Sequence, residues 1–316
     1  MGLRPRTASL VDGSFMAFKT LTIDSSAELH VHKGQLIAIQ GEVTTQVALE
    51  DLACVVFSHP DITISSAALA YLGSNGITLL TCGRGYMPAT ITLPFAPHSK
   101  YSGIVARQLG CTVGFRNGLW KTIVRRKILN QARALELMGV DHTALLQMAS
   151  EVRSGDSTNR EALAARVYFQ LYEPGYSRTK VCPLTSALNY GYAVLRSTLA
   201  RQVVSHGFIT SVGFFHHNEK NEFNLVDDLI EAFRPMVDLH VSKIELVGEA
   251  PDNLSRAVRK QITGVLREQC LINGHETSIL IATEECVESL ARALEKGCPG
   301  DICLPEFCPS ASLSQS

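Results

Sequence analysis

Histidines and carboxylates are concentrated in the stretch GFFHHNEKNEFNLVDDLIEAFRP, which runs from Gly213 to Pro235. The two histidines close an apolar run, and three acids follow in a segment with helical spacing. Its candidate metal ligands are His216, His217, Asp227, Asp228 and Glu231. Imidazole nitrogen together with carboxylate oxygen suits Mn²⁺ well and Mg²⁺ tolerably. The stretch is therefore a candidate metal site, provided that the fold brings these side chains together.

An ordinary amphipathic helix explains the same residues without a metal. If a helix runs from about Leu225 to Val237, its apolar side chains form one stripe and its charged side chains gather on the opposite side. The stripe would contain Leu225, Val226, Leu229, Ile230, Phe233, Met236 and Val237. Acids near the N-terminus also suit the helix dipole. In this interpretation the carboxylates lie on the solvated side of the helix.

A further candidate acid, Glu161, lies in the segment DSTNREALAARVYFQLY. Thr158 and Glu161 stand three residues apart before an apolar-rich helix, which is the spacing of a capping box. Glu161 would then reach back to the amide of Thr158. Alternatively, its carboxylate lies in one cleft with His216 and Glu231. The spacing does not decide between these two roles.

Positive charge is concentrated in one part of the chain, although the net charge is only −1. No acid occurs between Asp61 and Glu136. The basic residues in this interval are Arg84, Lys100, Arg107, Arg116, Lys121, Arg125, Arg126, Lys127 and Arg133. Such asymmetry is typical of a surface that binds a phosphate backbone. A solvated helix face paired with acids of another segment would give the same pattern.

The composition is that of a globular protein with 316 residues, 46% of them hydrophobic. No apolar run approaches the ~18 residues needed to span a bilayer. We expect no signal peptide, because the N-terminal stretch lacks a continuous apolar region. Nine dispersed cysteines favour free thiols in a reducing cytoplasm. Cys298, Cys303 and Cys308 recur every five residues, so a zinc site is conceivable, but no fourth ligand is obvious.

The chain divides into a β-rich part and a helical part. Period-two alternation and short apolar runs predict strands through the first ~95 residues, with a turn at Lys33-Gly34. Long stretches with helical spacing follow. We predict an α+β fold with a small β-rich domain at residues 1–95, a linker at 96–102, and a larger α-helical domain at 103–316.

Several motifs together resemble one family. The stretches TNREALAARVYF, LNYGYAVLRSTLARQVVSHGF and GFFHHNEKNEFNLVDDLIEAFRP are similar to those of the CRISPR-associated integrase, the first protein of the module that captures new spacers, in its type II form. WKTIVRRKILNQA and the closing LPEF add to the resemblance, which covers about residues 18–307.

This resemblance implies an N-terminal β-sandwich, an α-helical catalytic domain and a metal-binding triad. By motif, the triad is Glu161 in the N-R-E step, His216 three residues past a glycine, and Glu231 at the end of D-L-I-E. Asp228 would support a ligand or serve as an alternative one. The implied cofactor is Mg²⁺ or Mn²⁺. Arg84, Arg125 and Arg126 are the expected DNA-binding residues.

The resemblance also implies the reaction and the partners. In the family, homodimers flank a dimer of CRISPR-associated protein two in a heterohexamer and hold double-stranded DNA. The 3′-hydroxyl of the captured DNA attacks a phosphodiester at the edge of the repeat. We expect a cytoplasmic, metal-dependent DNA integrase and endonuclease without membrane contact. The alternatives are a nuclease on branched DNA, a non-catalytic DNA-binding scaffold, and an unrelated metal hydrolase.

Overall fold

Two four-stranded sheets form the N-terminal part of the computed structural model, which describes residues 19–49, 52–83, 88–93, 100–177, 179–251 and 253–309. The first sheet contains, in spatial order, β1 (Lys19–Ile23), β5 (Leu52–Phe57), β7 (Thr78–Cys82) and β8 (Pro88–Thr92). The second contains β4 (Val43–Ala48), β3 (Gln35–Gln40), β2 (Ala27–His32) and β6 (Ile62–Ile64). The predicted β-rich N-terminal part is confirmed.

The central strand β5 of the first sheet is buried on both faces, which explains why it is apolar throughout. Val55 and Phe57 of β5 pack into a core shared with the second sheet. Cys54 and Val56, which point to the other face, belong to the core of the helical part. The short helix α1 (Ser66–Ser74) adds Leu72 to the core between the sheets. The sheet therefore connects the two parts of the molecule.

Local turn chemistry agrees with the sequence. Lys33 and Gly34 join β2 to β3 with φ of 48° and 77°, as a two-residue hairpin turn requires. Ser65 begins α1, since its hydroxyl accepts a hydrogen bond from the amide of Ala68 at 3.2 Å. The turn at Lys33 and Gly34 was expected from the sequence.

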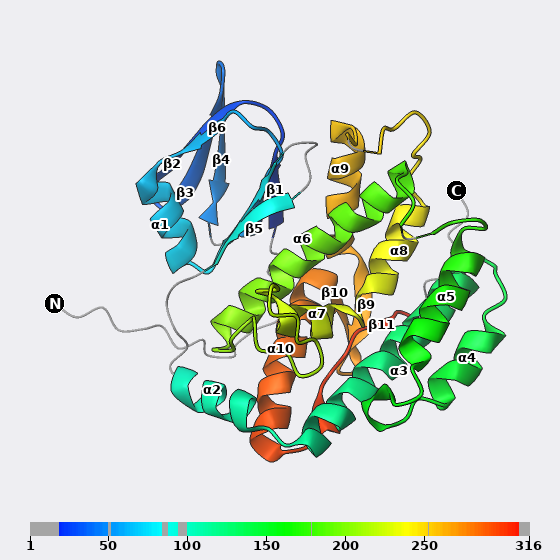
Figure 1. Ribbon diagram of the computed structural model, residues 1–316. Coiled ribbons are helices and arrows are strands. Elements are labelled where there is room, and N and C mark those ends of the chain that lie inside the picture. The colour runs from blue at the N-terminus through cyan, green and yellow to red at the C-terminus, as the bar shows by residue number, and fades with distance from the viewer. Residues whose placement is uncertain are drawn as a thin grey trace.

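Helices dominate the rest of the chain (Figure 1). They are α2 (Tyr101–Gly110), α3 (Val113–Leu137), α4 (Thr143–Ser150), α5 (Arg160–Tyr172), α6 (Pro183–Ser205), α7 (Asn224–Ile230), α8 (Arg234–Ser242), α9 (Arg256–Thr263) and α10 (Ile279–Lys296), with the short 3₁₀ helices η3 (Ser154–Asp156), η4 (Gly264–Arg267) and η5 (Pro299–Asp301). A small sheet is interleaved with them, in the order β10 (His275–Ser278), β9 (Gln269–Ile272), β11 (Glu306–Phe307). The α+β class is confirmed, and the part expected to be entirely helical also contains these three strands.

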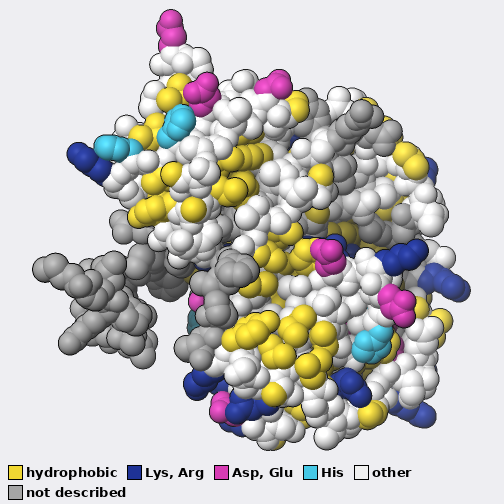
Figure 2. All heavy atoms as spheres, turned by 60° about the vertical axis from the view of Figure 1, so that its left-hand side comes forward, with side chains coloured by type: hydrophobic (Ala, Val, Ile, Leu, Met, Phe, Trp, Pro, Cys, Tyr) yellow, Lys and Arg dark blue, Asp and Glu magenta, His cyan; other side chains and the backbone are white. Residues whose placement is uncertain are grey.

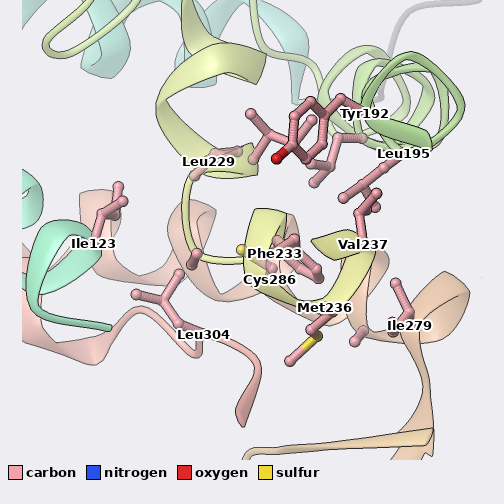
Figure 3. Packing of buried hydrophobic residues seen from close by; sticks show 14 of the residues in the cluster. Ile123, Tyr192, Leu195, Leu229, Phe233, Met236, Val237, Ile279, Cys286 and Leu304 are labelled. Carbon is pink, nitrogen blue, oxygen red and sulfur yellow. The ribbon is translucent and has the colours of Figure 1, made fainter. Parts of the chain in front are cut away.

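One large core holds the helical part together (Figure 3). Side chains of α3, α6, α7, α8 and α10 meet around Phe233, which is fully buried. Leu304, from the C-terminal segment, lies beside them. In Figure 1, α6 runs between the strands and the other helices, consistent with its contacts to β7 and β8.

The helix predicted over Leu225 to Val237 is broken, and that expectation was wrong. α7 ends at Ile230 and α8 begins at Arg234. Pro235 explains the break, because proline has no amide proton and its ring would clash with the carbonyl four residues earlier. The apolar stripe is nevertheless buried as expected. The charged side is not solvated: Asp228 and Glu231 are buried as well.

Two sequence expectations are not resolved by the fold. The division at residue 95 and the linker at 96–102 stay predictions, because residues 94–99 lie outside the described part of the chain.

None of the helices in the described ranges is both long and apolar enough to cross a membrane.

Close packing of α6 against α8 explains the glycine in the LNYGY motif. A Cβ atom on Gly191 would lie 2.5 Å from Cγ1 of Val237 and 3.2 Å from Cγ2 of Ile262. We expect Gly191→Ala to lower the free energy of unfolding by about 1–3 kcal/mol, because the added methyl group overpacks the core. Thermal or urea unfolding measures this change.

The matched control is Gly73→Ala in α1, where a Cβ atom meets nothing within 4 Å. This substitution should be neutral or slightly stabilising, because alanine favours a helix more than glycine does. Equal stability of the Gly191 and Gly73 variants would contradict the account of the α6–α8 contact.

Candidate functional site

A buried lysine joins two of the predicted ligands. Nζ of Lys127, on α3, lies 2.5 Å from Oε2 of Glu231 and also forms an ion pair with Oε1 of Glu161. The Lys127 side chain is only 8% exposed, and those of Glu161 and Glu231 are 28% and 9% exposed. The two glutamates, seventy residues apart in the sequence, therefore meet around one ammonium group.

Glu161 is positioned by the start of α5, but not through the predicted capping box. Asp156 accepts hydrogen bonds from the amides of Arg160 (2.8 Å) and Glu161 (3.0 Å), and so satisfies two free donors at this helix end. The residue before the helix, Asn159, has a φ of 53°. Because Asp156 takes the capping role, the Glu161 side chain is directed to Lys127, and the capping-box interpretation is wrong.

Glu231 stands at the break between α7 and α8. The break frees backbone carbonyls, and Nδ2 of Asn130, also on α3, donates a hydrogen bond to the carbonyl of Ala232 at 2.7 Å. Nε of Arg234 lies 2.9 Å from Oε1 of Glu231. Pro235, Asn130 and Arg234 thus fix the glutamate in place.

The charges of this cluster stabilise one another. Burial by itself raises the pKa of Glu231, but Arg234 and Lys127 outweigh it and hold that pKa at about 2. Burial lowers the pKa of Lys127, but Glu231 and Glu161 outweigh it and raise that pKa above its ordinary value. Glu231 and Lys127 are therefore both ionised at neutral pH.

Asp228 organises the turn that carries His216. Its Oδ2 accepts hydrogen bonds from the amides of Phe214 (2.6 Å) and Phe215 (3.1 Å). Its Oδ1 lies 2.9 Å from the amide nitrogen of His216 and 2.8 Å from Nδ1 of the same residue. The hydrogen bond between the side chains of Asp228 and His216 raises the pKa of His216, whereas burial lowers it. Both oxygens of Asp228 are engaged, which favours a supporting role over that of an alternative ligand.

The glycine before the histidines has a steric reason. A Cβ atom on Gly213 would lie 2.4 Å from the carbonyl oxygen of His216, so only glycine allows the turn to close. His217, by contrast, is exposed and lines a separate groove with Gln108 and Arg116. Of the two histidines, the structure brings only His216 to Asp228.

An aromatic pair borders His216. Trp120 of α3 stacks on Phe215 with ring centroids 4.0 Å apart and an interplanar angle of 7°. The imidazole of His216 meets both rings edge-on, at 5.6 Å from Trp120 and 5.8 Å from Phe215. Trp120 and Lys127 lie seven residues apart, which is about two helical turns, so both project toward the same side of α3.

The donor set suits a divalent cation. With Nδ1 of His216 bound to Asp228, Nε2 is the nitrogen left for a ligand, as in carboxylate–histidine–metal arrangements. Oε2 of Glu231 is buried and makes no well-aligned hydrogen bond within the described residues. In the same part of the chain no three His, Cys, Asp or Glu side chains are grouped closely enough to hold an ion. Lys127 accounts for this, because its ammonium separates the two carboxylates.

Two of the predicted DNA-binding arginines, Arg125 and Arg126, lie outside this cluster. Arg84 is outside the described residues. Arg125 and Arg126 line an open groove of about 520 Å³ together with Lys121, and Arg126 pairs with Glu306 at 2.7 Å. On the face shown in Figure 2, Lys and Arg side chains lie mainly toward its margin and are interspersed with acids. Lys127, counted with the basic surface in the sequence, is instead buried in the site.

The cysteines form neither disulfides nor a metal cluster. All nine are free thiols, as expected. Cys298 is exposed and Cys308 is buried, and they belong to no group of potential zinc ligands in the described residues.

Sequence reasoning missed four supporting residues: Trp120, Lys127, Asn130 and Asp156. Lys127 carries a usable signal, since it falls between Ile123, Val124 and Ile128 on the apolar side of α3, where a solvated lysine has no place. The role of Asn130 depends on contacts with separate segments, which spacing does not reveal. Asp156 acts locally, but on amides four and five residues later, which is not the usual spacing of a helix cap.

Fold and site together define a β-sheet domain joined to a helical domain that gathers acids and a histidine. A model of the CRISPR associated protein Cas1 family matches residues 21–246. The chain is 35% identical over 297 residues to CRISPR-associated endonuclease Cas1 of Neisseria meningitidis serogroup C (strain 8013), with 93% of this chain and 98% of that protein covered. The chain therefore belongs to the Cas1 family, and the predicted family and role in CRISPR adaptation are confirmed.

Solved structures share the fold. A casposase bound to integration product has a TM-score of 0.71 at 18% identity, covering 88% of this chain and 91% of that one. A Cas1 protein from Thermotoga maritima also has a TM-score of 0.71, at 15% identity, covering 88% and 97%. A chain of a Cas6-RT-Cas1–Cas2 complex has a TM-score of 0.68 at 18% identity, covering 96% of this chain and 37% of that one.

The hydrogen bonds of Asp228 predict that replacing Asp228 lowers the free energy of unfolding more than replacing its neighbour Asp227. Asp228→Asn replaces one accepting oxygen by a donating amide that faces N–H groups, so we expect it to lower the free energy of unfolding by about 2–4 kcal/mol. Asp227→Asn is the matched control: Asp227 is partly exposed and pairs with Arg196 at 2.7 Å, so its loss should cost about 1 kcal/mol or less. Chemical denaturation compares the two, and equal effects would contradict the assigned role of Asp228.

Proposed function

We propose that this protein is a divalent-metal-dependent DNA integrase and endonuclease. The 3′-hydroxyl of captured DNA attacks a phosphodiester at the edge of the repeat, a new P–O bond forms, and the P–O bond to the neighbouring nucleotide breaks, which releases that nucleotide's 3′-hydroxyl. The observation that carries the proposal is the meeting of Glu161 and Glu231 around one buried cation, beside a histidine whose Nδ1 is held by Asp228. Carboxylates and imidazole held in this way form a typical set of ligands for catalytic metal ions.

Glu161, His216 and Glu231 are the proposed ligands of Mg²⁺ or Mn²⁺. When bound, the ion would polarise the phosphoryl oxygen and stabilise the charge that develops during phosphodiester transfer. The site can admit DNA, because the side chains of Glu161 and His216 are 28% and 38% exposed. Glu231 forms its buried inner side.

The remaining residues of the site prepare these ligands. Asp228 holds the imidazole ring of His216 in one orientation and leaves Nε2 available. Arg234 keeps Glu231 ionised at its place beside the helix break. Lys127 balances the two glutamates, and its positive charge also favours the approach of an anionic phosphate.

DNA and a second protein are the proposed partners. One structural neighbour is a casposase bound to integration product, and another is a complex that contains Cas1 and Cas2. By analogy, we propose that homodimers of this chain assemble with the small CRISPR-associated protein two into a heterohexamer on double-stranded DNA. The groove with Lys121, Arg125 and Arg126 would contact the phosphate backbone without reading its sequence.

A nuclease acting on branched DNA is the second candidate function, favoured by the name endonuclease given to the Neisseria relative. The same ligands would serve it, with water in place of the 3′-hydroxyl. Cleavage of junctions without the partner protein, and no transfer into repeat-bearing DNA with it, would favour this function.

Removal of one proposed ligand should abolish the reaction without unfolding the protein. We expect Glu161→Ala to lower strand transfer into repeat-bearing DNA by roughly 10²–10³-fold, in the presence of the partner and Mg²⁺ or Mn²⁺. Its thermal stability should change little, because Lys127 keeps its ion pair with Glu231. Normal transfer together with a loss of stability would contradict the assignment of Glu161 as a ligand and leave its ion pair with Lys127 as a purely structural contact.

The neighbouring histidines supply the matched control for this assay. His216→Ala should lose transfer, whereas His217→Ala should keep it, because His217 is exposed and lies outside the Asp228 network. Equal losses, or a loss only at His217, would contradict the assignment.

The two arginines of the basic groove should differ in their effect on DNA binding. Arg125 is exposed, whereas the guanidinium of Arg126 is already paired with Glu306. We expect Arg125→Ala to reduce the slope of log affinity against log salt concentration by about 1, and Arg126→Ala to reduce it less. Fluorescence anisotropy at several salt concentrations measures both. An unchanged slope in Arg125→Ala would exclude this groove as a phosphate-binding surface.

A further inference from the structure

Adjacent phenylalanines in the GFFH step have opposite environments. Phe214 is buried and meets Phe115 edge-on at 6.1 Å. Phe215 is 45% exposed, although it immediately precedes His216. Its amide is held by Asp228, which fixes the backbone that presents the ring. A single exposed apolar side chain is ordinary on a protein surface, but this ring is held on a fixed backbone next to His216 and is placed to contact a ligand of that site.

The orientation of the Phe215 ring limits what that ligand can be. Trp120 covers one face of the ring in a nearly parallel stack, and His216 meets it edge-on. The exposed surface therefore belongs to the opposite face and the outer edge. A flat ring backed by a second parallel ring is a surface for another planar, aromatic group, which would extend the stack.

We propose that the open face of Phe215 stacks on an unpaired nucleobase at the reacting end of the DNA, and so positions that strand at the metal site. This inference rests on the proposed function, because it takes the substrate to be a DNA strand with a 3′-hydroxyl. Phe215 would be a base-stacking residue, and Trp120 would support it from behind. Stacking tolerates any base, as insertion of varied DNA requires.

The spacing of the side chains leaves room for about one nucleotide between Phe215, the proposed base-stacking residue, and His216, the proposed metal ligand. The rings of Phe215 and His216 are 5.8 Å apart, less than two nucleotide steps of ~3.4 Å along a strand. The base on Phe215 would therefore belong to the reacting nucleotide or its immediate neighbour. Beyond it, Arg116 and His217 line an open groove of about 400 Å³, in which Glu219 is the single acid, and this groove offers a path for the following backbone.

Fluorescence of 2-aminopurine tests the contact directly. The analogue replaces the base of the 3′-terminal nucleotide in a DNA duplex with a short single-stranded end, and the protein carries Glu161→Ala so that transfer is blocked. We expect binding to quench the fluorescence several-fold. Phe215→Tyr should keep the quench, whereas Phe215→Leu, which retains apolar bulk over Trp120 but no aromatic face, should lose most of it with similar DNA affinity.

A second experiment measures strand transfer by protein in which Glu161 is intact. Wild type should transfer a substrate with an abasic 3′-terminal nucleotide about tenfold less efficiently than a normal one, and Phe215→Leu should not distinguish the two. Equal quenching by Phe215→Leu and Phe215→Tyr would overturn the inference. So would an altered oligomeric state of Phe215→Leu with unchanged quenching, because Phe215 would then contact a protein.

These outcomes are separable from a failure of the proposed function. If Glu161→Ala retains transfer in the separate assay, the metal-site proposal fails whatever the fluorescence shows. If transfer depends on Glu161 and quenching is independent of Phe215, only the stacking inference fails.

Discussion

Two glutamates with little exposure to solvent cannot both stay ionised side by side without a cation, and the site depends on this constraint. Lys127 supplies the positive charge between Glu161 and Glu231, and Arg234 adds a second one against Glu231. Because a charge removed from water is costly unless it is paired, this cluster holds together three segments that are distant in the sequence. In the proposed function, a divalent ion takes over the role that the ammonium group has here.

One face of α3 organises most of the site. Trp120 supports the ring that precedes His216, Lys127 joins the glutamates, and Asn130 holds the carbonyl of Ala232 at the helix break. These residues are separated by seven and three positions, so helical geometry places them along one side of a single rigid element. The turn with His216 and the break with Glu231 are irregular backbone, and packing against α3 gives them a fixed geometry.

The sequence predicted the fold class and the buried stripe, because periodic apolar residues report directly which side of an element is buried. It did not predict the break in the stripe, although Pro235 was visible, since regular spacing continues across it. The helical wheel alone also placed Asp228 and Glu231 on the solvated side of the helix. Their burial depends on partners from other segments, which the wheel does not show. Asp156 shows a different limit: its contacts are local, but a carboxylate two residues upstream of Thr158 caps the helix in place of the expected capping box.

The central claim is that the charge between Glu161 and Glu231 is exchangeable between an ammonium group and a divalent ion. A crystal of the full-length protein soaked in Mn²⁺, with anomalous scattering recorded at the manganese edge, tests it most directly. We expect one anomalous peak bounded by Glu161, Glu231 and Nε2 of His216, with Lys127 displaced from between the carboxylates. A peak elsewhere, or Lys127 still between the glutamates at saturating Mn²⁺, would contradict it.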